Sequence, residues 1–185
     1  MADTEYETKI IKSDMETPVE QHIIDDSFFV EDKNKPYLVS QIILSGKYNR
    51  IYNVVTYFIT LNDDLVIVDG DILVFAVFTQ FVIVDLKQDK LIRTVKPENG
   101  QIFGIYKFKS GYFLRGETAN CFLDKDFNIV WENGCIDIFV NFKTERDFEI
   151  HEDYITAYDW YGYKHYYNER GEFKEEYYLC YDCNK

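Results

Sequence analysis

The sequence predicts an all-β protein built from consecutive antiparallel β-meanders of about 40 residues each. Two observations carry this prediction. Alanine, the best helix former, occurs only four times in 185 residues, whereas Val, Ile, Tyr, Phe and Thr are abundant. Apolar residues come in runs of strand length, and Gly, Asn and Asp separate these runs.

The first 32 residues differ from the rest of the chain. They carry ten acidic residues and two lysines, together with the apolar pairs Ile10–Ile11, Ile23–Ile24 and Phe28–Phe29. We expect residues 1–32 to form a partly ordered acidic leader that adds a strand near Ser27–Glu31. The chain from Thr4 onward is also compatible with a short helix. Residues 33–185 are predicted to form a single β-meander domain.

A repeat becomes visible when the polar turns are aligned. Each unit is a strand, a short turn, a second strand that ends in Asp or Asn, a tight turn and a third strand. The residues that end the second strand are Asp85, Asp124 and Asn168. A weaker hairpin precedes them, with strands over 37–44 and 51–60 and a turn at 45–46.

The turns have a physical reason to form. An Asp or Asn side chain at the start of a tight turn accepts hydrogen bonds from backbone amides two residues further on. Gly171 adopts a positive φ without strain, and Asn128 adopts one with more strain. The flanking strands therefore return antiparallel, and neighbouring meanders stack because one meander cannot bury both of its faces.

The repeat resembles the blades of β-propellers, of the pyrroloquinoline-quinone-like or WD-repeat kind, over roughly residues 37–179. The resemblance rests on the segments that end in Asp85, Asp124 and Asn168. It implies a propeller-like fold or an open blade stack. Propellers close with about four to eight blades, whereas this chain has three clear units and no Gly-His…Trp-Asp pair in each. A β-sandwich or barrel is the alternative.

The charge balance limits the classes of partner. The chain has 20 Lys and Arg against 33 Asp and Glu, which gives a net charge of −13. Phosphate neutralisation needs clustered cations, so direct binding to nucleic acid or to an anionic membrane is disfavoured. A basic protein is the electrostatic complement. The sequence shows neither a signal peptide nor a membrane-spanning run, which predicts a cytoplasmic protein.

No motif in the sequence indicates catalysis, a metal or a cofactor. The histidines, which are His22, His151 and His165, do not belong to a zinc-protease motif, and no nucleophile elbow or phosphate-binding loop is present. A Cys–His nucleophile pair assembled from distant residues is disfavoured relative to inert thiols. Cys180 and Cys183 have metal-ligand spacing but lack a second pair, so we expect reduced, unliganded thiols.

An aromatic segment over 158–167 is the candidate binding site. On a hairpin that turns near Tyr161–Gly162, alternate side chains point to opposite faces of the sheet. One set packs inward, and the other presents aromatic rings beside acidic groups, which suits a protein interface. Packing of both sets into the core is the alternative. The predicted partner-binding residues are Glu152, Asp153, Tyr158, Asp159, Trp160, Tyr161, Tyr163 and His165.

Four functions compete on these observations. The first is an inhibitor that neutralises a basic partner such as a nuclease toxin, because the chain resembles bacterial toxin-immunity proteins in size, acidity and lack of motifs. The second is a propeller-like scaffold or ligand-binding module. The third is a phage-type nucleic-acid mimic that blocks a nuclease. A hydrolase with paired carboxylates is the least favoured, since acid pairs are common in any acidic chain.

Overall fold

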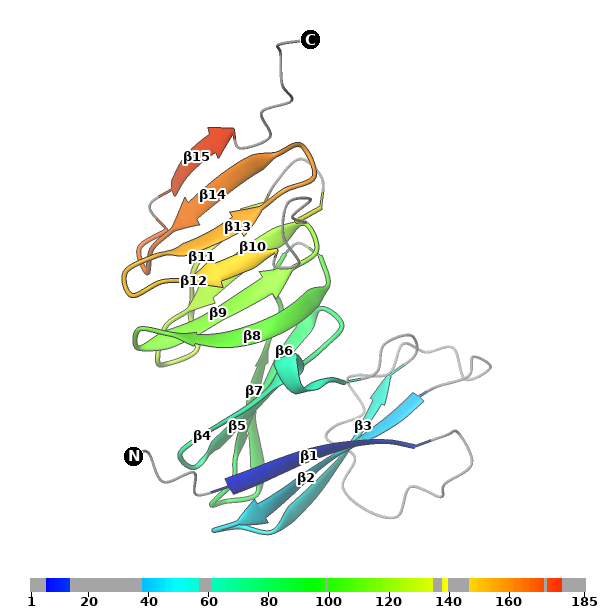
Figure 1. Cartoon of the computed structure of the whole chain (residues 1–185). Coiled ribbons are helices and arrows are strands. Elements are labelled where there is room, and N and C mark those ends of the chain that lie inside the picture. The colour runs from blue at the N-terminus through cyan, green and yellow to red at the C-terminus, as the bar shows by residue number, and fades with distance from the viewer. Residues whose placement is uncertain are drawn as a thin grey trace. The chain divides into compact units, whose positions relative to one another are not determined.

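The computed structural model describes residues 6–13, 38–56, 61–98, 100–134, 138–139, 147–171 and 173–177. The described chain is all-β: fifteen strands form four antiparallel sheets, and the helical content is one short 3-10 turn over Asp63–Leu65. Figure 1 labels the strands of each sheet. The chain divides into two compact units, Met1–Thr94 and Val95–Lys185. Within the described residues, no helix has the length and apolar character needed to span a bilayer.

The first sheet of unit 1 contains a strand where the sequence was also compatible with a short helix. Its strands are β1 (Tyr6–Ser13), β2 (Leu38–Gly46) and β3 (Arg50–Thr56), in that order. β1 pairs antiparallel with β2 along its whole length. The helix predicted from Thr4 is therefore wrong over β1, because pairing with a distant strand overrides local preference. The predicted turn at 45–46 is also displaced, since both residues belong to β2.

The second sheet of unit 1 is a four-stranded meander. Its strands are β4 (Val66–Asp69), β5 (Ile72–Val77), β6 (Gln80–Asp85) and β7 (Lys90–Val95). The side chains of β5 and β6 are buried on both faces, whereas those of the edge strand β7 alternate between exposed and half-buried. This burial explains why the sequences of β5 and β6 are continuous apolar runs, rather than an alternation of apolar and polar residues.

Polar contacts join the two sheets of unit 1. The Tyr52 hydroxyl on β3 donates a hydrogen bond to Asp89 in the β6–β7 turn, at 2.9 Å, and the guanidinium of Arg50 lies 3.3 Å from the same carboxylate. Burial, followed by the contact with Asp89, raises the pKa of Tyr52. Lys47 forms an ion pair with Asp71 at 2.8 Å. These contacts hold the β2–β3 hairpin against the turns of the second sheet.

Unit 2 consists of two further four-stranded meanders. The first contains β8 (Ile102–Phe108), β9 (Gly111–Gly116), β10 (Ala119–Leu123) and β11 (Ile129–Gly134). The second contains β12 (Phe148–Ile150), β13 (Ile155–Tyr158), β14 (Tyr163–Tyr167) and β15 (Phe173–Tyr177). Strand order follows chain order in both sheets. Each repeat therefore has one strand more than predicted, namely β4, β8 or β12, and matches a propeller blade in strand number and order.

The tight turns form as predicted from their Asp and Asn residues, with one correction. The Asp124 carboxylate accepts hydrogen bonds from the amides of Asp126 and Asn128, at 2.9 and 2.8 Å. The Asn168 side chain accepts one from the Arg170 amide at 2.8 Å. Gly171 has the predicted positive φ of 76°, but in the Asp124 turn the positive φ of 62° belongs to Phe127 rather than to Asn128.

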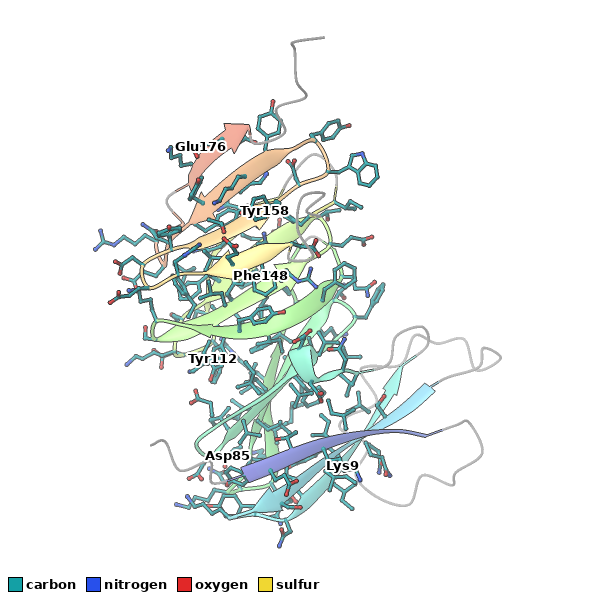
Figure 2. All side chains as sticks on the ribbon, in the orientation of Figure 1. Lys9, Asp85, Tyr112, Phe148, Tyr158 and Glu176 are labelled. Carbon is teal, nitrogen blue, oxygen red and sulfur yellow. The ribbon has the colours of Figure 1, made fainter. Side chains whose placement is uncertain are left out.

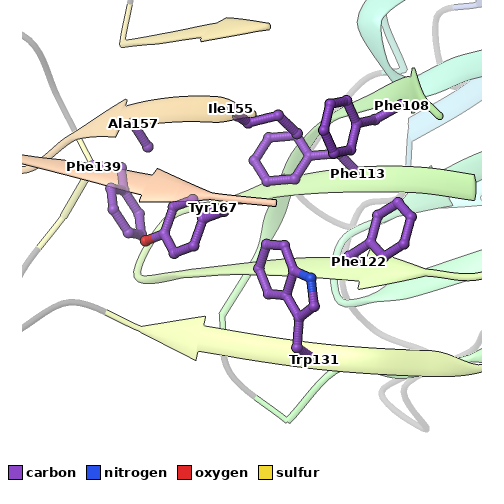
Figure 3. Packing of buried hydrophobic residues seen from close by; sticks show 8 residues of the cluster. All are labelled: Phe108, Phe113, Phe122, Trp131, Phe139, Ile155, Ala157 and Tyr167. Carbon is purple, nitrogen blue, oxygen red and sulfur yellow. The ribbon is translucent and has the colours of Figure 1, made fainter. Parts of the chain in front are cut away.

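An aromatic core joins the two sheets of unit 2 (Figure 3). Trp131 of β11 stacks on Tyr167 of β14, with ring centroids 5.1 Å apart, and on Phe122 of β10 at 6.1 Å. Such stacked pairs add to the free energy gained by burying the rings. The cluster consists of Phe108, Phe113, Phe122, Trp131, Phe139, Ile155, Ala157 and Tyr167. The cluster packs against one face of the β12–β15 sheet. This sheet also carries the candidate site.

The structure describes only part of the predicted acidic leader over residues 1–32. β1 lies inside the predicted leader over residues 1–32 and belongs to a sheet. The strand predicted near Ser27–Glu31 lies outside the described residues, as do Cys135, Cys180 and Cys183. The single domain predicted over 33–185 stays a prediction.

Candidate functional site

The β13–β14 hairpin carries the predicted aromatic segment, and its turn lies where the sequence placed it. The Asp159 amide donates to the carbonyl of Tyr163 at 3.0 Å, and the Gly162 amide donates to the carbonyl of Asp159 at 3.1 Å. Gly162 has a φ of 90°, a conformation that glycine adopts without strain. The Asp159 carboxylate also accepts a hydrogen bond from the Tyr163 amide at 2.9 Å, so its own side chain closes the turn.

A buried His–Asp pair forms the base of this turn. Nε2 of His165 lies 2.9 Å from Oδ2 of Asp159, and the two side chains are only 3% and 4% exposed. With Asp159 as the acceptor, Nε2 is the donor of this contact. Both residues were predicted to belong to a partner-binding surface. The structure instead buries them beneath the turn, where they are supporting groups.

Two aromatic contacts and two backbone hydrogen bonds anchor the base of the turn. The Phe139 ring meets the His165 ring edge-on, with centroids 5.4 Å apart. The Trp160 amide donates to the carbonyl of Ile138 at 2.9 Å, and the Phe139 amide donates to the carbonyl of Glu117 at 2.9 Å. His165 also stacks on Tyr167, with ring planes only 4° apart. The hairpin is thus attached to the β9–β10 turn of the neighbouring sheet.

Trp160 and Tyr161 occupy the tip of the hairpin. They are 48% and 51% exposed, although both are large aromatic side chains. Adjacent exposed rings of this kind combine apolar area with a polar group, which is typical of binding surfaces. The backbone beneath them is fixed by the hydrogen bonds of Asp159. We call these two residues the aromatic tip.

The remaining predicted aromatic residues lie on the hairpin strands and are half-buried. Tyr158 ends β13 and Tyr163 begins β14. The ammonium group of Lys164 lies 5.4 Å from the Tyr158 ring centroid and 5.1 Å from that of Tyr166. Figure 2 labels Tyr158 and, on the edge strand β15, Glu176. These contacts form a mixed aromatic and charged sheet face beside the aromatic tip.

The structure does not bring Glu152 and Asp153 to the aromatic tip. Both are exposed and lie in the β12–β13 turn, which is at the opposite end of β13 from the β13–β14 turn. Asp153 pairs with Lys109 of the β8–β9 turn at 2.5 Å. That hydrogen bond raises the pKa of Lys109. The predicted site therefore divides into an aromatic end and an acidic end.

The described cysteine does not have the properties of a nucleophile. Cys121 is buried on β10, and burial, followed by the charge of Glu132, raises its pKa to about 12. The group remains a protonated thiol at neutral pH, and thiols react as thiolates. Strand register places Cys121 and Phe122 on opposite faces of their sheet. Because Phe122 packs in the aromatic core, Cys121 lies on the face that points away from this core.

Glu175 is a further charged residue beside the His–Asp pair, and it was not among the predicted site residues. It pairs with His165 across β14 and β15, and its Oε1 lies 3.9 Å from Nδ1 of His165. Among the described residues, Asp159, His165 and Glu175 form a group whose oxygen and nitrogen atoms lie within 4.8 Å of one another. The pairing of Glu175 with His165 follows from the register of β14 and β15. The sequence predicts this register only when the exact length of the turn is known.

Comparisons with known proteins do not assign this chain to a family. No family model and no curated protein sequence matches it. Solved structures of Hsv2 from Kluyvelomyces marxianus and Kluyveromyces lactis are similar, with TM-scores of 0.44 and 0.43 and sequence identities of 11% and 12%. The alignments cover 76% and 75% of this chain but only 44% and 46% of those chains. The chain thus spans less than half the length of these structures.

Proposed function

We propose that the protein is a non-catalytic binding module, a propeller-like scaffold that holds a protein partner through the aromatic tip of the β13–β14 hairpin. The observation that carries this proposal is the exposure of Trp160 and Tyr161 side by side on a hydrogen-bonded turn. Aromatic side chains dominate the binding energy of many interfaces because they bury a large area with few rotatable bonds.

The rigid base of the tip supports this function. Asp159 and His165 hold the turn from below, and the Trp160 amide is bound to the carbonyl of Ile138. A contact surface that is ordered before binding loses less conformational entropy when a partner arrives. The two exposed rings therefore offer contact area without the cost of ordering a loop.

The charge of the chain favours a cationic partner. The net charge of −13 attracts a basic protein at long range and raises its association rate. Inhibition of a basic nuclease toxin, and mimicry of nucleic acid toward a nuclease, are narrower forms of this proposal. Both require the same contact surface and a salt-dependent association.

Affinity capture from native lysate tests the proposal. The immobilised full chain is compared with a W160A/Y161A variant, and with a Y154A variant that removes an exposed tyrosine from the opposite end of β13. We expect one protein to be retained by the wild type and by Y154A but to be lost from W160A/Y161A. Equal retention by all three chains would refute the assignment of the tip.

Salt separates the electrostatic part of the proposal from the aromatic part. Charge-steered association slows as ionic strength rises, because the Debye length falls from about 10 Å at 0.1 M to about 3 Å at 1 M. We expect the association rate of the captured protein to fall over this range, while the loss caused by W160A/Y161A persists. A rate that does not depend on salt would contradict a cationic partner.

A further inference from the structure

We propose that His165 and Glu175 bind a divalent transition-metal ion, with zinc as the preferred metal, and that Asp159 orients the histidine from behind. His165 lies on β14 and Glu175 is its direct cross-strand neighbour on β15. The metal would be coordinated by Nδ1 of His165 and by the carboxylate of Glu175. Water would complete its coordination shell.

The Asp159–His165 pair has the geometry of a group that supports a metal ligand. Metal-binding histidines commonly donate their second ring N–H to a carboxylate, which fixes the tautomer and makes the ligand nitrogen more basic. Here Nε2 of His165 lies 2.9 Å from Oδ2 of Asp159, in position to donate to it. With the hydrogen on Nε2, the lone pair that can bind a metal lies on Nδ1, the nitrogen on the Glu175 side of the ring.

The imidazole is held in this orientation by its surroundings. The side chain is 3% exposed, lies edge-on to Phe139 and stacks on Tyr167. The Asp159 carboxylate is itself fixed by the Tyr163 amide at 2.9 Å. A ligand that is already oriented needs little reorganisation when a metal arrives.

The separation of the two ligand atoms suits a small metal ion. Nδ1 of His165 and Oε1 of Glu175 are 3.9 Å apart, which is too long for a hydrogen bond. Two ligands at about 2.1 Å from a tetrahedral zinc ion are separated by roughly 3.4 Å. Glu175 is 43% exposed, so its side chain can rotate toward Nδ1 of His165.

The donor atoms favour zinc over calcium or magnesium. Imidazole nitrogen suits zinc, copper and nickel, whereas calcium and magnesium prefer shells made only of oxygen. With two ligands from the protein, the remaining positions stay open to water or to a group of a bound partner. Such an open shell distinguishes this site from a closed structural zinc site.

Zinc titration of the full chain by calorimetry tests the proposal, with a closely matched pair of variants. E175Q removes the ligand, and E176Q makes the same change one residue further on, on the opposite face of β15. Both are made in a C180S/C183S background, because thiols also bind zinc. We expect E175Q to weaken zinc binding at least tenfold and E176Q to leave it within twofold of the parent.

The supporting role of Asp159 has its own readout. D159N should weaken zinc binding by about ten- to a hundred-fold, while circular dichroism verifies that the sheet is retained. Nitrogen-detected NMR of the His165 ring should show zinc shifting Nδ1 while Nε2 keeps its hydrogen. The proposal is overturned if zinc shifts Nε2 instead, if neither nitrogen responds, or if E175Q and E176Q bind zinc equally.

Discussion

The indole Nε1 of Trp131 donates a hydrogen bond to the carbonyl oxygen of Asn168, at 3.0 Å. Trp131 lies on β11 and Asn168 begins the β14–β15 turn, so the bond joins the two meanders of unit 2. The Asn168 side chain meanwhile accepts from the Arg170 amide. One residue thus shapes its own turn and attaches that turn to the neighbouring sheet.

Gly171 in the same turn should not tolerate a side chain. A Cβ at this position would lie 2.7–2.9 Å from atoms of Trp131, and φ is 76°. We expect G171A to lower the free energy of unfolding by about 2–4 kcal/mol, from backbone strain and overpacking together. Urea unfolding followed by circular dichroism measures the change.

Gly70 provides the control for this prediction. It also has a positive φ, of 60°, but no atom lies within 4 Å of the position of a Cβ. G70A should therefore cost only the backbone strain, about 1 kcal/mol. Equal losses for G70A and G171A would show that the approach to Trp131 does not matter.

The ion pair between Arg115 and Asp147 should contribute to the attachment of the two sheets. Its atoms are 3.1 Å apart, and the side chains are 17% and 31% exposed. We expect D147N to destabilise unit 2 by about 1 kcal/mol, because the pair is partly shielded from solvent. D153N removes the partner of Lys109 at a position that is 82% exposed, and should leave the unfolding midpoint unchanged. A larger effect of D153N than of D147N would contradict this account.

The buried thiol of Cys121 should make unit 2 less stable in alkali. Its pKa is raised to about 12 in the folded chain, so the folded state keeps a proton that the unfolded state loses above about pH 8.5. The stabilising contribution is complete below that pH and declines as pH rises. Between pH 8 and pH 10 the free energy of unfolding should fall by about 2 kcal/mol.

A single tryptophan can report this effect. The chain contains only Trp131 and Trp160, and both belong to unit 2. In a W160F chain, fluorescence follows the buried Trp131 alone, and urea unfolding with a reductant present gives the stability at each pH. Adding C121A should remove most of the slope between pH 8 and pH 10. An unchanged slope would assign it to other groups.

The sequence predicted the meanders because their turns are determined locally. Asp124 and Asn168 make the amide contacts expected of their residue types. Long-range pairing is harder to predict. β1 forms a strand because it pairs with β2. The residues near Thr4 do not by themselves predict this pairing. The Asp and Asn turns that reveal the repeat join the last two strands of each meander, so they do not mark its first strand.

The candidate site was predicted as a segment but not as an arrangement. The predicted turn near Tyr161–Gly162 lies beside Trp160 and Tyr161, which were among the predicted partner-binding residues and are exposed. It did not show that Asp159 turns inward, because this depends on the hydrogen bond to His165 across the turn. Nor did it show that Glu152 lies at the other end of β13. The positions of these side chains depend on strand lengths and turn lengths. A hydrophobic pattern in the sequence defines both of these lengths poorly.

The central claim is that the aromatic tip is the surface through which the protein holds its partner. The most direct test is the dissociation constant of the captured partner for the wild type, W160A/Y161A and Y154A, measured by titration calorimetry. Loss of two central aromatic residues should cost at least 2 kcal/mol, about a thirtyfold increase in Kd. Y154A should leave Kd within twofold of the wild type. A Kd that W160A/Y161A leaves unchanged would contradict the account.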